Sequence, residues 1–170
     1  MKILYAPWRS EYTNDTKEGK NEGASEESCV FCNQFASDKD VEHGIIKRFD
    51  HSIIILNKYP YNAGHILILP LNHVDSLDKL APKIRAELME LITASVGTIK
   101  MALKAEGVNV GINIGKAAGA GIPAHLHIHL LPRWNGDTNF MPTIGKTKVI
   151  SFDLNTIYET LSKAFASVTL

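Results

Sequence analysis

Residues 125–131 read His-Leu-His-Ile-His-Leu-Leu, so histidine alternates with aliphatic residues over six positions. Successive side chains of a β-strand point to opposite faces, and this alternation therefore predicts a strand, which we expect over Ala124–Leu131. The three imidazoles would share one face at intervals of roughly 6.5–7 Å. Leu126, Ile128 and Leu130 would enter a core on the other face. Three histidines backed by an apolar face indicate a functional surface.

Two kinds of chemistry explain such an array. Several of the histidines can ligate a metal, although sites of that kind usually add a carboxylate and only Asp137 follows nearby. Alternatively, an imidazole with an ordinary pKa of about 6.5 is mostly neutral at pH 7 and can attack a phosphoryl group. Neighbouring imidazoles would then stabilise the charge on the non-bridging oxygens. The residues of this segment alone leave both alternatives open.

The flanking sequence predicts the rest of the fold. A run rich in β-branched residues, a turn and a second run predict a strand pair, and a long stretch with apolar residues at helical spacing begins at a proline. We expect strands over Val41–Phe49, His51–Asn57, His65–Leu71 and Val108–Ile114, a helix over Pro82–Ala105 ended by Gly107, and a shorter helix over Leu154–Phe165. This order predicts an α+β fold with an antiparallel sheet of about five strands.

Length and composition limit the possible functions. The 170 residues suit one domain over 1–170, with a flexible polar loop at about 13–28 and a carboxyl-terminal extension from about 135. Basic and acidic residues both number 18, which argues against a nucleic-acid partner. The amino terminus lacks a signal-peptide core, and the aliphatic runs are too short to cross a bilayer. We therefore expect a cytoplasmic protein with no membrane partner.

Two distant segments together carry a resemblance to a known family. Residues 125–131 match the signature His-φ-His-φ-His-φ-φ, where φ is apolar, and residues 57–70 read Asn-Lys-Tyr-Pro-Tyr-Asn-Ala-Gly-His-Ile-Leu-Ile-Leu-Pro. In both segments the chain resembles the histidine triad (HIT) family, and further segments look like its bacterial branch that includes diadenosine tetraphosphate phosphorylases. The resemblance implies a HIT-like fold, a homodimer, and a nucleotide substrate such as a dinucleoside polyphosphate.

The resemblance also implies roles for individual residues. His127 would attack the α-phosphate and form a covalent nucleotidyl-histidine, with its Nδ1–H held by a backbone carbonyl. His129 would contact the α-phosphate and His65 would complete the histidine set. Asn57 would hold the ribose hydroxyls and Asn113 would lie beside the phosphates. For both asparagines, hydrogen bonding at a strand end is the alternative.

The sequence departs from the family pattern in one loop. Phosphorylase relatives carry serine at the position of Gly121, so we expect backbone N–H groups around Gly119 and Gly121 to bind phosphate instead. Both hydrolysis and phosphorolysis stay open. A nucleoside phosphoramidase is an alternative enzyme, and a nucleotide-binding regulatory protein with incidental turnover is an alternative of another class.

The two cysteines, Cys29 and Cys32, form a Cys-x-x-Cys pair. In a reducing compartment such a pair favours a metal site or free thiols over a disulfide. HIT proteins with this pair resemble galactose-1-phosphate uridylyltransferase, which implies that His73 and His125 complete a structural zinc site. Two buried free thiols are the alternative.

Overall fold

The computed structural model describes residues 25–145 and 152–170. The expected polar loop at 13–28 is therefore described only from Ser25 onward. Glu26–Ser28 form the short 3-10 helix η1. Residues 13–24 of the predicted loop lie outside the described residues.

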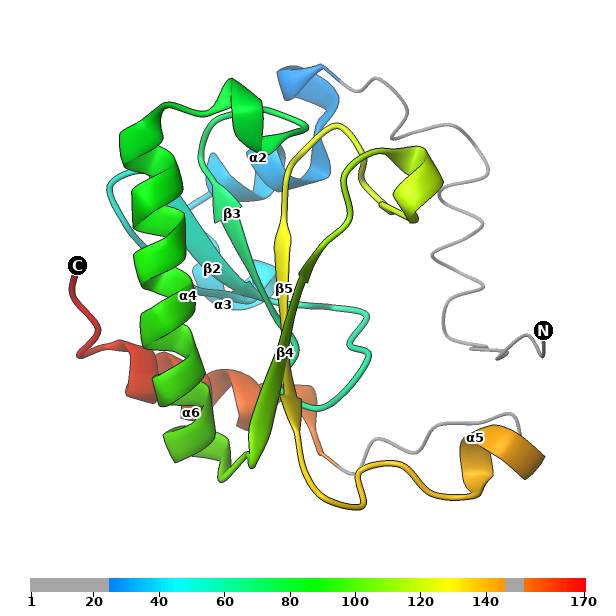
Figure 1. Cartoon of the computed structure of the whole chain (residues 1–170). Helices are drawn as coiled ribbons and strands as arrows, with labels where there is room; N and C mark the ends of the chain where they lie inside the picture. The colour runs from blue at the N-terminus through cyan, green and yellow to red at the C-terminus, as the bar shows by residue number, and fades with distance from the viewer. Residues whose placement is uncertain (1–24, 146–151) are drawn as a thin grey trace.

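A five-stranded antiparallel sheet forms the centre of the fold (Figure 1). The strand order is β1-β2-β3-β5-β4, so β3 and β5 are neighbours although the long helix and β4 separate them in sequence. The fold class predicted from the sequence is confirmed. The strands are β1 (Ile45–Arg48), β2 (Ser52–Leu56), β3 (Ile66–Pro70), β4 (Gly107–Ile112) and β5 (Ile128–Arg133).

Both faces of the sheet are covered, which explains the unbroken apolar run of β2. Ile54 and Leu56 face one hydrophobic cluster, whereas Ile53 and Ile55 face a second cluster on the other side. The first cluster includes side chains of α4 (Pro82–Leu103) and α6 (Leu154–Phe165), which lie along that face in Figure 1. The second includes side chains of α2 (Val30–Phe35). Shorter elements are α3 (Asp40–His43), η2 (Leu77–Lys79), η3 (Lys116–Ala118) and α5 (Met141–Ile144).

The two main helices begin and end for identifiable reasons. Pro82 occupies the first turn of α4, where its missing N–H costs nothing. The helix stops at Leu103 because Lys104 adopts the left-handed conformation (φ 52°), so the prediction that Gly107 ends it is wrong. Asp153 caps α6 by accepting a hydrogen bond from the Thr156 backbone N–H at 2.9 Å. The predicted bounds of α6 are confirmed.

Two predicted strands, β1 and β5, begin four residues later than expected. The segment Val41–Phe49 starts with the last residues of α3, and Gly44, at φ 69°, ends that helix before β1. The ladder of β5 begins at Ile128 rather than Ala124, because its neighbours β3 and β4 pair no earlier than this residue. Among described residues, no helix combines the length and apolarity needed to cross a membrane.

Candidate active site and metal centre

The predicted alternation of faces holds along residues 125–130, even where they precede the ladder. Leu126, Ile128 and Leu130 belong to the cluster shared with α4. The three histidines lie on the opposite side and are 1%, 5% and 9% exposed. The ring centroids of His127 and His129 are 5.0 Å apart. The segment therefore presents a compact row of buried imidazoles.

The ring of His127 is oriented by its own main chain. Its Nδ1–H donates to the backbone carbonyl of His125 at 2.8 Å, so the lone pair of the neutral ring resides on Nε2. Burial lowers the pKa of His127, against the opposing effect of this hydrogen bond. The ring is therefore kept neutral at pH 7, which is the form that acts as a nucleophile.

His65 and His129 form a second hydrogen-bonded unit. The backbone N–H of Tyr61 donates to Nδ1 of His65 at 3.1 Å, which leaves the single proton of the neutral ring on Nε2. That Nε2 lies 2.9 Å from Nδ1 of His129 and donates to it. A neutral His129 must then carry its own proton on Nε2. Burial, followed by the charges of His129 and His127, lowers the pKa of His65 to about 3.

A cleft of about 660 Å³ opens beside these rings. Every residue expected to contact the substrate lies on its wall: Asn57, Asn113, Gly119, Gly121, His127 and His129. His65 is fully buried behind the wall and contacts three residues that line the cleft, namely His129, Asn57 and Tyr61. Asn57 also accepts a hydrogen bond from the Tyr59 backbone N–H at 2.9 Å, so the strand-end role considered for it is present as well.

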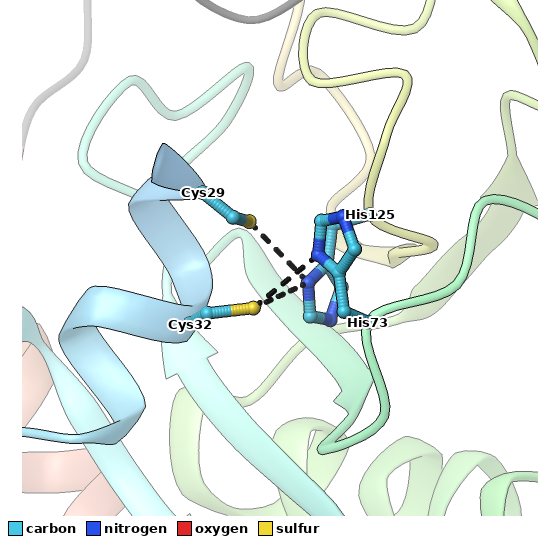
Figure 2. A group of neighbouring side chains, drawn as sticks. All are labelled: Cys29, Cys32, His73 and His125. Carbon is cyan, nitrogen blue, oxygen red and sulfur yellow. Dashed lines mark hydrogen bonds between the residues drawn. The ribbon is translucent and has the colours of Figure 1, made fainter. Parts of the chain in front are cut away.

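The structure also brings together the four residues of the expected metal site. One ligand atom from each of Cys29, Cys32, His73 and His125 lies within 4.8 Å of the others (Figure 2). The Sγ of Cys32 is 3.3 Å from Nδ1 of His73 and 3.5 Å from Nδ1 of His125. Zinc bonds of about 2.3 Å to sulfur and 2.05 Å to nitrogen give a tetrahedral S–N edge of about 3.5 Å. The four side chains therefore fit a tetrahedral zinc ion.

The surroundings of this cluster leave His125 with a ligand atom that points toward the two thiols. His125 donates from Nε2 to the backbone carbonyl of Pro70 at 3.0 Å, which leaves Nδ1 available as a ligand. Burial lowers the pKa of His125 to about 4, so its ring stays neutral. Burial and then the Cys29 thiol raise the pKa of Cys32 to about 12. A bound cation would stabilise the thiolate that this environment otherwise disfavours.

Several residues of the site were not predicted from the sequence. Tyr61 holds the tautomer of His65, and its ring stacks on His129 with centroids 5.8 Å apart. Phe31 packs against His127 with ring centroids 5.6 Å apart, and both Phe31 and Gln34 line the cleft. Tyr158 of α6 lines it as well. The position of Tyr61 in the turn before His65 is the one signal that would have suggested its role.

Comparisons with known proteins agree with this geometry. A family model described as "HIT domain" matches residues 38–136. The chain is 34% identical over 150 residues, 88% of its length and 77% of the relative's, to an AP-4-A phosphorylase of Mycobacterium tuberculosis. A crystal structure of a Zn-bound histidine triad family protein from Mycobacterium smegmatis superposes with a TM-score of 0.69 at 28% identity, covering 84% of this chain and 96% of that one. The crystal structure of a hypothetical histidine triad nucleotide-binding protein from Sulfolobus tokodaii superposes with a TM-score of 0.63 at 30% identity. The match covers 80% of this chain and 88% of that one.

Proposed function

The chain belongs to the HIT-domain family, and from this premise we propose that it cleaves dinucleoside polyphosphates, with diadenosine tetraphosphate as a substrate. The observation that carries the proposal is the hydrogen bond from His127 Nδ1 to the His125 carbonyl, because it directs the Nε2 lone pair of a cleft residue away from the backbone. The AP-4-A phosphorylase name of a relative 34% identical to this chain supports the substrate class.

The reaction takes place in two steps. His127 Nε2 attacks the α-phosphorus of one adenylate and forms a P–N bond, while the bond from that phosphorus to the bridging oxygen breaks and ATP leaves. The product is a nucleotidyl-histidine, held while the second acceptor enters. Water then releases AMP, or inorganic phosphate releases ADP, and in either case His127 is regenerated.

Neighbouring groups stabilise the charge that develops on phosphorus. The tautomer of His129 places an N–H on Nε2, and this N–H would donate to a non-bridging oxygen. His65 maintains that tautomer from behind. Asn57 and Asn113 lie on the wall where a ribose and the phosphates would pass, and Gly119 and Gly121 expose backbone there without side chains. These residues are therefore assigned to substrate binding.

Product analysis tests the proposal. The purified protein is incubated with diadenosine tetraphosphate, with and without inorganic phosphate, and the nucleotides are separated by chromatography. AMP with ATP identifies asymmetric hydrolysis, and ADP with ATP in the presence of phosphate identifies phosphorolysis. Cleavage of an adenosine phosphoramidate alone would instead identify a phosphoramidase. Tight nucleotide binding without any cleavage would point to a regulatory binding protein.

A structural zinc ion belongs to the same proposal. The Zn-bound relative and the fit of Cys29, Cys32, His73 and His125 to a tetrahedron support it. The ion would connect the start of α2 to the segment that carries His127, two residues beyond His125. Thiol ligands require reducing conditions, so we place the enzyme in the cytoplasm.

A homodimer is also part of the proposal. Strand β4 is an edge of the sheet, and Val110 on it is 45% exposed, with Ile114 just beyond at 47%. Met101 near the end of α4 is 81% exposed. Apolar side chains along an open edge are typical of a surface that another sheet covers. Light scattering on the purified protein measures the mass that this predicts, twice that of one chain.

A further inference from the structure

The part of the cleft wall formed by α2 is mainly apolar, and the attack on phosphorus does not require apolar residues there. Val30, Phe31 and Gln34 all line the cleft from this one helix. Val30 and Gln34 are four residues apart and so share a face of the helix. Ile55 and Leu67, from β2 and β3, line the cleft as well. The helix and the sheet thus form an apolar region interrupted by a single side-chain amide.

Gln34 contributes a buried acceptor to this apolar region. Its Oε1 is inaccessible to solvent and has no hydrogen-bond partner among residues 25–145 and 152–170. Burying a carbonyl oxygen without a partner is unfavourable, and nearly all such groups in folded proteins have one. Because the Gln34 side chain also lines the cleft, rotation about its last torsion would turn Oε1 toward a ligand, whose N–H group would supply the missing partner.

The position of Gln34 suggests which part of a nucleotide would reach it. Phe31 packs against the row of histidines, with its ring centroid 5.6 Å from that of His127. Gln34 follows Phe31 by three residues, which corresponds to about 4.5 Å along the helix axis. When the α-phosphorus is at His127 and the ribose at Asn57, the base enters the apolar region that contains Gln34.

We propose that Gln34 is a base-selecting residue: its Oε1 accepts a hydrogen bond from the exocyclic amino group of the substrate's base. A 6-aminopurine would satisfy the buried oxygen. A 6-oxopurine such as hypoxanthine would place a second acceptor against it and would be rejected. This inference rests on the proposed function for the position of the phosphate.

Binding of AMP and IMP tests the inference, because the two nucleotides differ only at one edge of the base, where IMP has an oxo group in place of the 6-amino group and a proton on N1. Titration calorimetry measures their dissociation constants for the wild type, Gln34→Met, Gln34→Glu and Asn33→Met. We expect the wild type to bind AMP tighter by on the order of tenfold. Gln34→Met removes the acceptor but keeps a side chain of similar length. It should bring the dissociation constants for AMP and IMP to within about twofold of each other. Gln34→Glu keeps an acceptor and should keep the preference.

Asn33→Met is the matched control, because Asn33 is exposed on the same helix and does not line the cleft. It should preserve the wild-type ratio. Thermal unfolding verifies that each variant folds, and Gln34→Leu replaces Gln34→Met if the latter does not. Equal binding of AMP and IMP by the wild type, or an unchanged ratio in the folded variant, would overturn the inference. Preference for AMP without cleavage of any dinucleoside polyphosphate would leave the inference standing and refute the proposed function.

Discussion

His65 donates a hydrogen bond from Nε2 to Nδ1 of His129 across 2.9 Å, and the direction of this bond is fixed by the Tyr61 backbone N–H on the far side of His65. The backbone N–H of Tyr61 thus determines which nitrogen of His129 carries the proton, and the His129 ring lines the cleft. The turn before β3 is therefore part of the proposed catalytic arrangement through its main chain as well as through the side chain of His65.

The buried His65 should make the protein less stable in mild acid. Its pKa in the folded protein is about 3, against about 6.5 in an unfolded chain. Between these values the unfolded state binds a proton that the folded state excludes, so stability falls as pH drops, by up to about 1.4 kcal/mol per pH unit. His65→Asn should reduce this slope. Urea unfolding of both proteins from pH 4 to pH 7 measures it, and identical slopes would contradict the assignment.

Replacing His127 should remove turnover and preserve binding. His127→Ala lacks the attacking nitrogen, so we expect kcat for diadenosine tetraphosphate to fall by on the order of 10³ or more. AMP should still bind within about tenfold of the wild-type affinity. His51→Ala is the control, since His51 lies outside the catalytic cleft. A His127→Ala variant with full activity would rule out nucleophilic catalysis by this ring.

Loss of one thiol ligand should release the metal and lower stability. Cys32→Ser is expected to reduce bound zinc from about one ion per chain to less than half, and to lower Tm by on the order of 10 °C. Asn33→Ser changes the next, exposed residue and should alter neither quantity. Elemental analysis and calorimetry provide the two measurements. A wild type purified without zinc at full stability would show that the four side chains form no metal site.

We expect any side chain at Gly64, the residue before His65, to lower the stability of the protein. The φ of Gly64 is +72°, and a Cβ would overlap with Leu103 Cδ1 and lie 3.1 Å from Pro132 Cγ. Gly64→Ala should therefore cost about 1–3 kcal/mol of unfolding free energy. Gly97→Ala, within α4 and with nothing within 4 Å, should instead stabilise by about 0.5–1 kcal/mol. Denaturant unfolding distinguishes the two, and equal effects would contradict this reasoning.

Local sequence patterns predicted most of the fold because they depend on short-range periodicity. The β2–β3 pair follows from two aliphatic runs and the turn between them, and the long helix follows from helical spacing and Pro82. The predicted start of β5 was wrong because a strand's first ladder residue depends on its neighbours. Leu126 illustrates this: its N–H donates to the carbonyl of Val74, in a loop, at 2.6 Å.

The candidate site was likewise predictable from the sequence only where a local pattern was sufficient. The common face of the three histidines was predictable from alternation alone, whereas the joining of Cys32 with His125, 93 residues away, came from the family resemblance. The contributions of Gln34 and Tyr61 depend on which face of α2 meets the sheet and on the path of one turn. A glutamine in a short helix has no sequence pattern that indicates its buried oxygen.

The pairing of β3 with β5 has a consequence for the newly synthesised protein. Leu67 lies opposite His129 in this pairing, so the two halves of the proposed active site meet only when chain segments some sixty residues apart come together. The β2–β3 hairpin can form early during translation, because its contacts are local. A ribosome-bound chain nevertheless lacks the β3–β5 pairing until residue 133 has emerged, and a product truncated before residue 127 would carry Asn57 and His65 without the proposed nucleophile.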